Sequence, residues 1–88
     1  MVKISELTDI VRMATPVLYR TTYTATAVLL HDSIPREAKR IEFCVERTAV
    51  GPHHIRARFL DDIDYPLVPA ISALNAHISK LHEDGELP

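Results

Sequence analysis

The segment TTYTATAVLL, residues 21–30, carries the clearest strand signal in the chain. Threonine takes every second position from residue 22 to residue 26, and Tyr23, Ala25 and Ala27 lie at the positions between. Threonine and tyrosine favour extended backbone, and side chains alternate across a strand, so this period of two predicts a half-buried β-strand. The small side chains of Ala25 and Ala27 on its inward face predict that a helix approaches the sheet closely.

Two further alternating runs follow this strand. Residues 41–45 alternate apolar and polar side chains, and residues 55–59 repeat the pattern after a break at Gly51-Pro52, which predicts a hairpin. Residues 34–47 also fit a helical stripe, so strand and partial helix both remain open for that segment. His31–Ala38 contains aspartate, serine and proline, and we expect a loop there.

The N-terminal residues show helical spacing. Ser5 is a suitable N-cap, and Pro16 would end the helix because it has no amide proton and clashes with the preceding turn. The apolar stripe of this predicted helix consists of Leu7, Ile10, Val11 and Ala14.

A second helix is predicted near the C-terminus. The acidic run Asp61-Asp62-Ile63-Asp64 offers three candidate caps, and Pro66 and Pro69 are compatible only with the first turns. Gly85 would end the helix. Its predicted buried stripe is Leu67, Ala70, Ile71, Leu74, Ile78 and Leu81.

These elements predict one α+β domain over residues 1–88, with the order α-β-β-β-α. The simplest assembly is a two-layer fold: a three-stranded antiparallel meander with both helices packed on one face. Residues 83–88 are polar, and we expect them to fray.

Composition and charge narrow the class of protein. The chain has 88 residues, of which 47% are hydrophobic and 25% charged, which is average for a soluble domain. No uninterrupted apolar run is long enough for a membrane span, no signal peptide is visible, and there is one cysteine, so we expect a cytoplasmic protein. The net charge of −2 argues against nucleic-acid binding by bulk attraction.

With both helices on one side, the other face of the predicted sheet stays bare. Alternation places on it Thr22, Thr24, Thr26, Glu42, Cys44, Glu46, His54, Arg56 and Arg58. Opposite charges on neighbouring strands neutralise each other, which is typical of a solvated surface. Apolar Val28, Leu30 and Leu60 extend the same face, and they favour a contact surface instead.

The residues that could support metal or covalent chemistry are scattered. His53 and His54 are adjacent and would point to opposite faces, and His77 and His82 are five apart, whereas chelation on a helix needs three or four. Cys44 beside the arginines of the next strand is the only candidate nucleophile, and no cleft or signature accompanies it. We therefore expect no metal, no cofactor and no enzymatic activity.

The predicted order of elements is also that of double-stranded-RNA-binding domains. The loop Gly51-Pro52-His53-His54 resembles their Gly-Pro-x-His loop. It follows the second predicted strand here, whereas in that family it follows the first. Aspartates 61, 62 and 64 stand where the family places a lysine cluster, and they would repel phosphate. These departures lead us to assign no family from the sequence.

The sequence thus predicts a small cytoplasmic protein-interaction module that forms a homodimer or binds another protein. The predicted interaction face comprises Val28, Leu30, Cys44, His54, Arg56, Arg58 and Leu60. One alternative is a binding protein for a small acidic ligand, recognised by His54, Arg56 and Arg58. A weaker alternative is RNA binding through the same basic strand.

Overall fold

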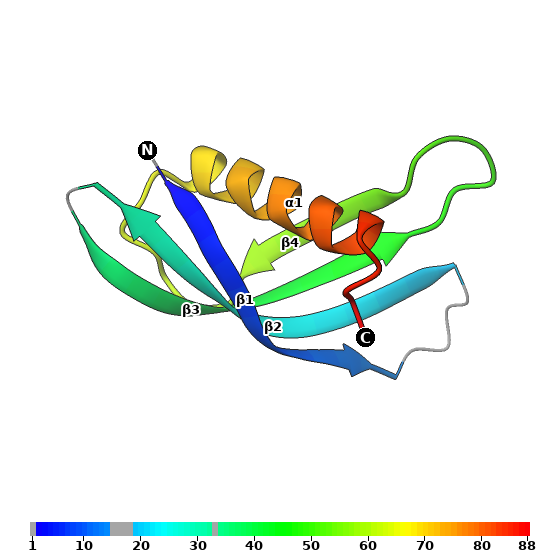
Figure 1. Cartoon of the computed structure of the whole chain (residues 1–88), viewed down its shortest axis with the longest axis horizontal. Coiled ribbons are helices and arrows are strands. Elements are labelled where there is room, and N and C mark those ends of the chain that lie inside the picture. Colours follow the sequence, from blue (N-terminus) through cyan, green and yellow to red (C-terminus); the bar gives the residue numbers. More distant parts are fainter. Residues whose placement is uncertain (1, 15–18, 33) are drawn as a thin grey trace.

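The structure, a computed structural model, describes residues 2–14, 19–32 and 34–88 and contains four strands followed by one helix (Figure 1). In chain order these are β1 (Lys3–Met13), β2 (Arg20–His31), β3 (Ile34–Glu46), β4 (His54–Phe59) and α1 (Leu67–Glu83). The strands form one antiparallel meander in the order β1-β2-β3-β4. The α+β class is confirmed, with four strands and one helix in place of three strands and two helices.

Helix α1 lies across one face of the curved sheet and buries the core against it (Figure 1). Ala25, Ala27 and Ala70 are completely buried in this core, which confirms that small side chains sit where helix and sheet meet. The buried cluster consists of Val2, Tyr23, Ala25, Ala27, Leu29, Ile41, Phe43, Val45, Tyr65, Ala70, Leu74 and Ile78.

The helix predicted for the N-terminal residues is wrong, because Lys3–Met13 is strand β1. The pairing with β2 shifts register between Ile4 and Glu6 and again between Thr8 and Val11. Each irregularity adds a residue, so the side chains that reach the core are Ile4, Leu7 and Ile10, three residues apart. A strand bulged in this way reproduces the spacing of a helix. Pro16, the predicted helix end, lies outside the described residues.

The loop predicted at His31–Ala38 is also wrong. Strand β2 continues to His31 and β3 begins at Ile34, and pairing runs from Leu29 opposite Glu37 to Arg20 opposite Glu46. The strand interpretation of residues 34–47 is therefore confirmed through Glu46. Good helix formers in this segment are overridden by their pairing with β2, because propensity is a weak term beside a complete ladder.

The predicted C-terminal helix is confirmed, but its start differs from the expectation. Its N-cap is Pro66, which makes no side-chain cap hydrogen bond. The acidic run ends too early in the chain to cap it. Asp61 instead accepts a hydrogen bond from the backbone N–H of Arg40 at 2.8 Å. Leu67, predicted to be buried, is 59% exposed because it lies in the first turn, beyond the packed stripe.

The helix ends as predicted, at Gly85. This residue has a φ of +71°, and its N–H donates to the carbonyl of His82. The N–H of Glu86 reaches back to the carbonyl of Leu81, which completes a Schellman motif. The chain then turns over the sheet: Leu87 packs against the core, and Tyr23 donates to the carbonyl of Pro88 at 3.0 Å. The expected fraying of residues 83–88 is therefore not observed.

Within the described residues, no helix combines the length and the apolar character needed to cross a membrane.

Candidate functional site

The face of the sheet opposite α1, here called the open face, is built by the alternating residues of all four strands. Because directly paired residues share a face, the register fixes its rows. Val11 lies beside Thr24, Glu42 and Arg58, and Met13 beside Thr22, Cys44 and Arg56. The described residues of the open face include Glu6, Val11, Met13, Arg20, Thr22, Thr24, Thr26, Val28, Leu30, Arg40, Glu42, Cys44, Glu46, His54, Arg56, Arg58 and Leu60.

Charges on the open face are largely neutralised by neighbours. Arg58 contacts Glu42 at 3.3 Å, as the sequence predicted. Glu46 pairs with Arg20 at 3.2 Å rather than with an arginine of β4. A third pair, Arg36 with Glu6, closes at 3.0 Å. Each pair is solvent-exposed and contributes at most about 1 kcal/mol, so the consequence of these contacts is charge balance more than stability.

The apolar residues of the predicted interaction face differ in how much surface they offer. Leu30 and Leu60 are 38% and 46% exposed, whereas Val28 is only 8% exposed. Strand β1 adds two that the sequence analysis missed, Val11 at 55% and Met13 at 41%. They were missed because this segment was assigned to a helix; the alternation that would have revealed them is interrupted by the bulges.

A shallow hollow of about 200 Å³ lies around the centre of β3 and β4 on the open face. Its polar lining consists of Arg20, Thr22, Glu42, Cys44, Arg56 and Arg58. Cys44 is the direct cross-strand partner of Arg56. Among the described residues, no hydrogen bond or ion pair engages the Arg56 side chain. His54, predicted to bind with these arginines, pairs with Glu46 at the end of β4 and does not line the hollow.

The histidines separate as predicted. His54 lies on the open face, whereas His53 contacts His82 on the helix side, with ring centroids 4.4 Å apart. No group of three or more His, Cys, Asp or Glu side chains is placed to hold a metal ion within the described residues.

At the other end of the helix side, Tyr65 is buried beside His31, with ring centroids 5.5 Å apart. Its hydroxyl oxygen has no hydrogen-bond partner among the described residues. Burial, followed by the negative charges of Glu37 and Asp64, raises the pKa of Tyr65 above its ordinary value. The arrangement holds a neutral phenol and supplies no catalytic base.

No curated protein and no solved structure shows significant similarity to this chain. The sequence model that defines the BB_0187 family matches residues 1–83, and the chain therefore belongs to that family.

Proposed function

We propose that this chain is a non-enzymatic protein-interaction module that forms a homodimer through its open face. The observation that carries the proposal is the exposed apolar surface there: Val11, Met13, Leu30 and Leu60 project from a sheet face that no described element covers. Apolar side chains spread among threonines and balanced charges are typical of a non-obligate interface.

Charge balance favours a second copy as the occupant. A two-fold interface places the same patch against itself, so an unbalanced patch would meet its own charge. The pairs Arg58–Glu42, Arg20–Glu46 and Arg36–Glu6 are closed within one copy, and they remove most of that repulsion.

The dimensions of the molecule are also adequate. Its principal extents are 42, 25 and 21 Å, so a face along the longest axis measures at least 42 by 21 Å. A standard interface takes about 800 Å² from each partner, which such a face supplies if most of it is covered.

Absolute molar mass, measured by light scattering over a range of protein concentrations, tests this proposal. We expect the mass to rise from 9.9 kDa towards twice that value, and Leu30→Lys and Arg56→Glu to weaken the association. Leu67→Lys is the matched control, because Leu67 is an exposed leucine on α1, away from the open face. A wild-type monomer at every concentration, or equal weakening by Leu67→Lys, would contradict the proposal.

A second candidate function is favoured by the hollow beside Cys44. An unpaired guanidinium over a cavity of about 200 Å³ suits the carboxylate or phosphate of a small acidic ligand. The supporting residues are then Arg56, Arg58 and Arg20, with Arg20 in the role predicted for His54. Thermal stabilisation of the wild type by a panel of acidic metabolites, absent in Arg56→Gln, would support this function, and a flat response across the panel would contradict it.

A further inference from the structure

The helix-side face of the sheet extends beyond the end of α1, and its chemistry changes there (Figure 1). Along the covered part, inward positions are apolar: Tyr23, Phe43 and Val45 belong to the core. Just beyond them, the residues on the same side become basic. Arg12 is the direct partner of Tyr23 across β1 and β2, and Arg47 follows Val45 by two residues.

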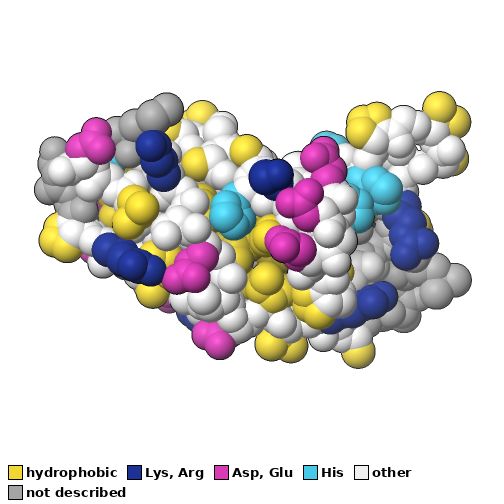
Figure 2. Space-filling view, in the orientation of Figure 1, with side chains coloured by type: hydrophobic (Ala, Val, Ile, Leu, Met, Phe, Trp, Pro, Cys, Tyr) yellow, Lys and Arg dark blue, Asp and Glu magenta, His cyan; other side chains and the backbone are white. Residues whose placement is uncertain are grey.

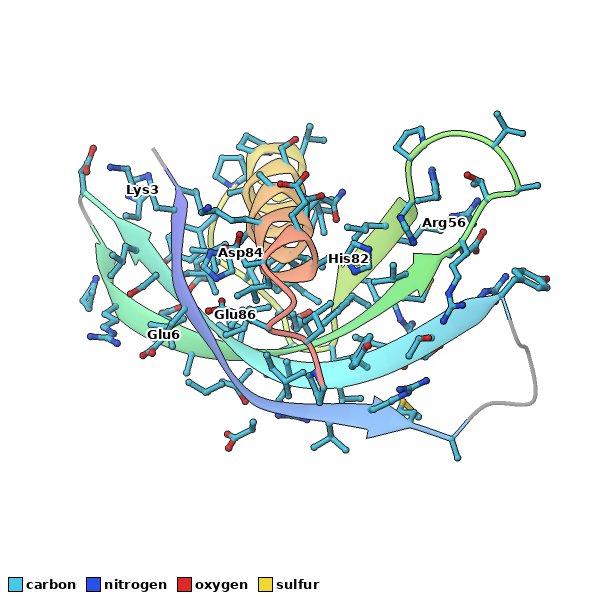
Figure 3. The ribbon with its side chains drawn as sticks, turned by 45° about the vertical axis from the view of Figure 1, so that its right-hand side comes forward. Lys3, Glu6, Arg56, His82, Asp84 and Glu86 are labelled. Atoms are coloured by element: carbon cyan, nitrogen blue, oxygen red, sulfur yellow. The ribbon has the colours of Figure 1, made fainter. Side chains whose placement is uncertain are left out.

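Four basic side chains surround one hollow at this end of the molecule. Arg12, Arg47, His53 and His82 line a cavity of about 120 Å³ together with Thr21, Tyr23 and Val45. Figure 2 shows histidine side chains next to Lys or Arg side chains beside the β3–β4 loop. His82 lies where α1 ends, beside β4 (Figure 3). Its ring meets that of His53 at an interplanar angle of 61°.

The positive charge of this cluster is not neutralised within the described residues. The side chains of Arg20, Arg36 and Arg58 are held by carboxylates, and that of Arg40 donates to Thr26. The side chains of Arg12 and Arg47, by contrast, have neither a hydrogen bond nor an ion pair in the described part of the chain. On a protein of net charge −2, two such guanidiniums around one cavity mark a local site for an anion.

The opposite end of the same face provides a contrast. There the inward positions of β3 are also charged, but Glu37 and Lys39 contact each other at 3.8 Å. Polar residues at a strand end therefore do not by themselves require a ligand. The distinction of the cluster is that its members share one sign.

A second hollow of about 210 Å³ adjoins the first and shares His53 and His82 with it. Its lining adds Pro52, Ile55, Ser79 and Glu83. The carboxylate of Glu83 would disfavour an anion in this second hollow, whereas it would accept a hydrogen bond from a hydroxyl group. The smaller cavity holds the volume of about four water molecules, enough for one tetrahedral oxyanion.

We propose that Arg12, Arg47, His53 and His82 form a binding site for the phosphate group of a small hydroxyl-bearing phosphate monoester. The phosphate occupies the smaller hollow, and the rest of the ligand extends towards Ser79 and Glu83. Two guanidiniums and two imidazoles offer more donors than the two oxygens of a carboxylate accept, which favours phosphate. The site lies on the helix side of the sheet, so it is independent of the proposed dimer face.

Nuclear magnetic resonance titration of the ¹⁵N-labelled protein tests the proposal, with inorganic phosphate and glycerol 3-phosphate as probes. We expect saturable shifts of the amide resonances of residues 12, 47, 53 and 82, with glycerol 3-phosphate binding more tightly than inorganic phosphate. Arg47→Gln should raise the dissociation constant at least about fivefold, because one charge-assisted hydrogen bond is lost. Arg36→Gln, an equal loss of charge elsewhere, should change it less than about twofold.

Arg47→Gln keeps the contact that holds this segment, because the backbone N–H of Arg47, not its side chain, donates to Tyr19. His82→Gln provides a second variant, and the dispersion of each spectrum reports whether the variant is folded. Acetate and chloride at matched ionic strength separate phosphate recognition from general screening. Equal shifts with acetate or chloride, or shifts spread over all basic residues and lowered as much by Arg36→Gln, would overturn the proposal.

Discussion

The ring of Tyr23 stacks on the ring of Phe43, with centroids 4.9 Å apart and planes 20° from parallel. The two residues are direct cross-strand partners in β2 and β3. The hydroxyl of Tyr23 also donates to the carbonyl of Pro88. One side chain thus ties the centre of the sheet to the segment that follows α1.

The two parts of this contact should separate by substitution. Phe43 is 1% exposed, so Phe43→Ala should lower the free energy of unfolding by about 3–5 kcal/mol through lost burial and a cavity. Tyr23→Phe keeps the ring and loses only the hydrogen bond, and should cost about 0.5–1.5 kcal/mol. Urea denaturation measures both values. Equal losses would mean that the link to Pro88, not the stacked pair, dominates.

Tyr65 should behave in the opposite way to Tyr23. Its buried hydroxyl has no hydrogen-bond partner among the described residues, so Tyr65→Phe should leave the free energy of unfolding at pH 7 unchanged or raise it. A loss of more than about 1 kcal/mol would show that the hydroxyl is satisfied in solution.

The raised pKa of Tyr65 also predicts a dependence on alkaline pH. The folded protein holds the phenol neutral, mainly through burial, and binds its proton more tightly than the unfolded chain. The stability that this proton contributes is complete below the unfolded value of about 10 and is lost as pH rises through the folded value. Between about pH 9 and 11, wild-type stability should therefore fall more steeply than that of Tyr65→Phe. Parallel decreases would contradict this.

Much of the sheet is readable from the sequence because β2, β3 and β4 keep a strict period of two. The same rule identifies most of the open face, including Cys44 opposite Arg56. Strand β1 escapes the rule because two irregularities move its core side chains to a spacing of three. Sequence periodicity cannot distinguish that spacing from a helix, since only pairing with β2 defines it.

The basic cluster on the helix side was hidden for a different reason. Arg12, Arg47 and His53 lie in three segments, and His82 lies on α1, so their proximity depends on the complete fold. One signal was available: at residue 47, the inward alternation of β3 ends in a charge instead of an apolar side chain. Its meaning depends on where the helix ends over the sheet.

The bulge at Asp9 can be tested directly. Asp9 has a φ of +52°, in the left-handed region that costs most L-residues about 1–2 kcal/mol. Asp9→Gly should change the free energy of unfolding by less than about 0.5 kcal/mol, because relief of strain is offset by greater freedom of the unfolded chain. Asp9→Val should lower it by about 1–2 kcal/mol. Denaturation curves in which valine is tolerated as well as glycine would indicate regular pairing of β1 in solution.

Cys44 provides a chemical probe of whether the open face is occupied. If a second copy covers this face, alkylation of Cys44 by a neutral maleimide should slow as protein concentration rises, and Leu30→Lys should restore the rate. A control thiol comes from Val50→Cys in a Cys44→Ser background, since Val50 is 90% exposed in the β3–β4 loop. Its rate should not depend on concentration. A Cys44 rate that is equally independent of concentration would mean that the open face stays uncovered, and the search would then turn to a small acidic ligand beside Arg56.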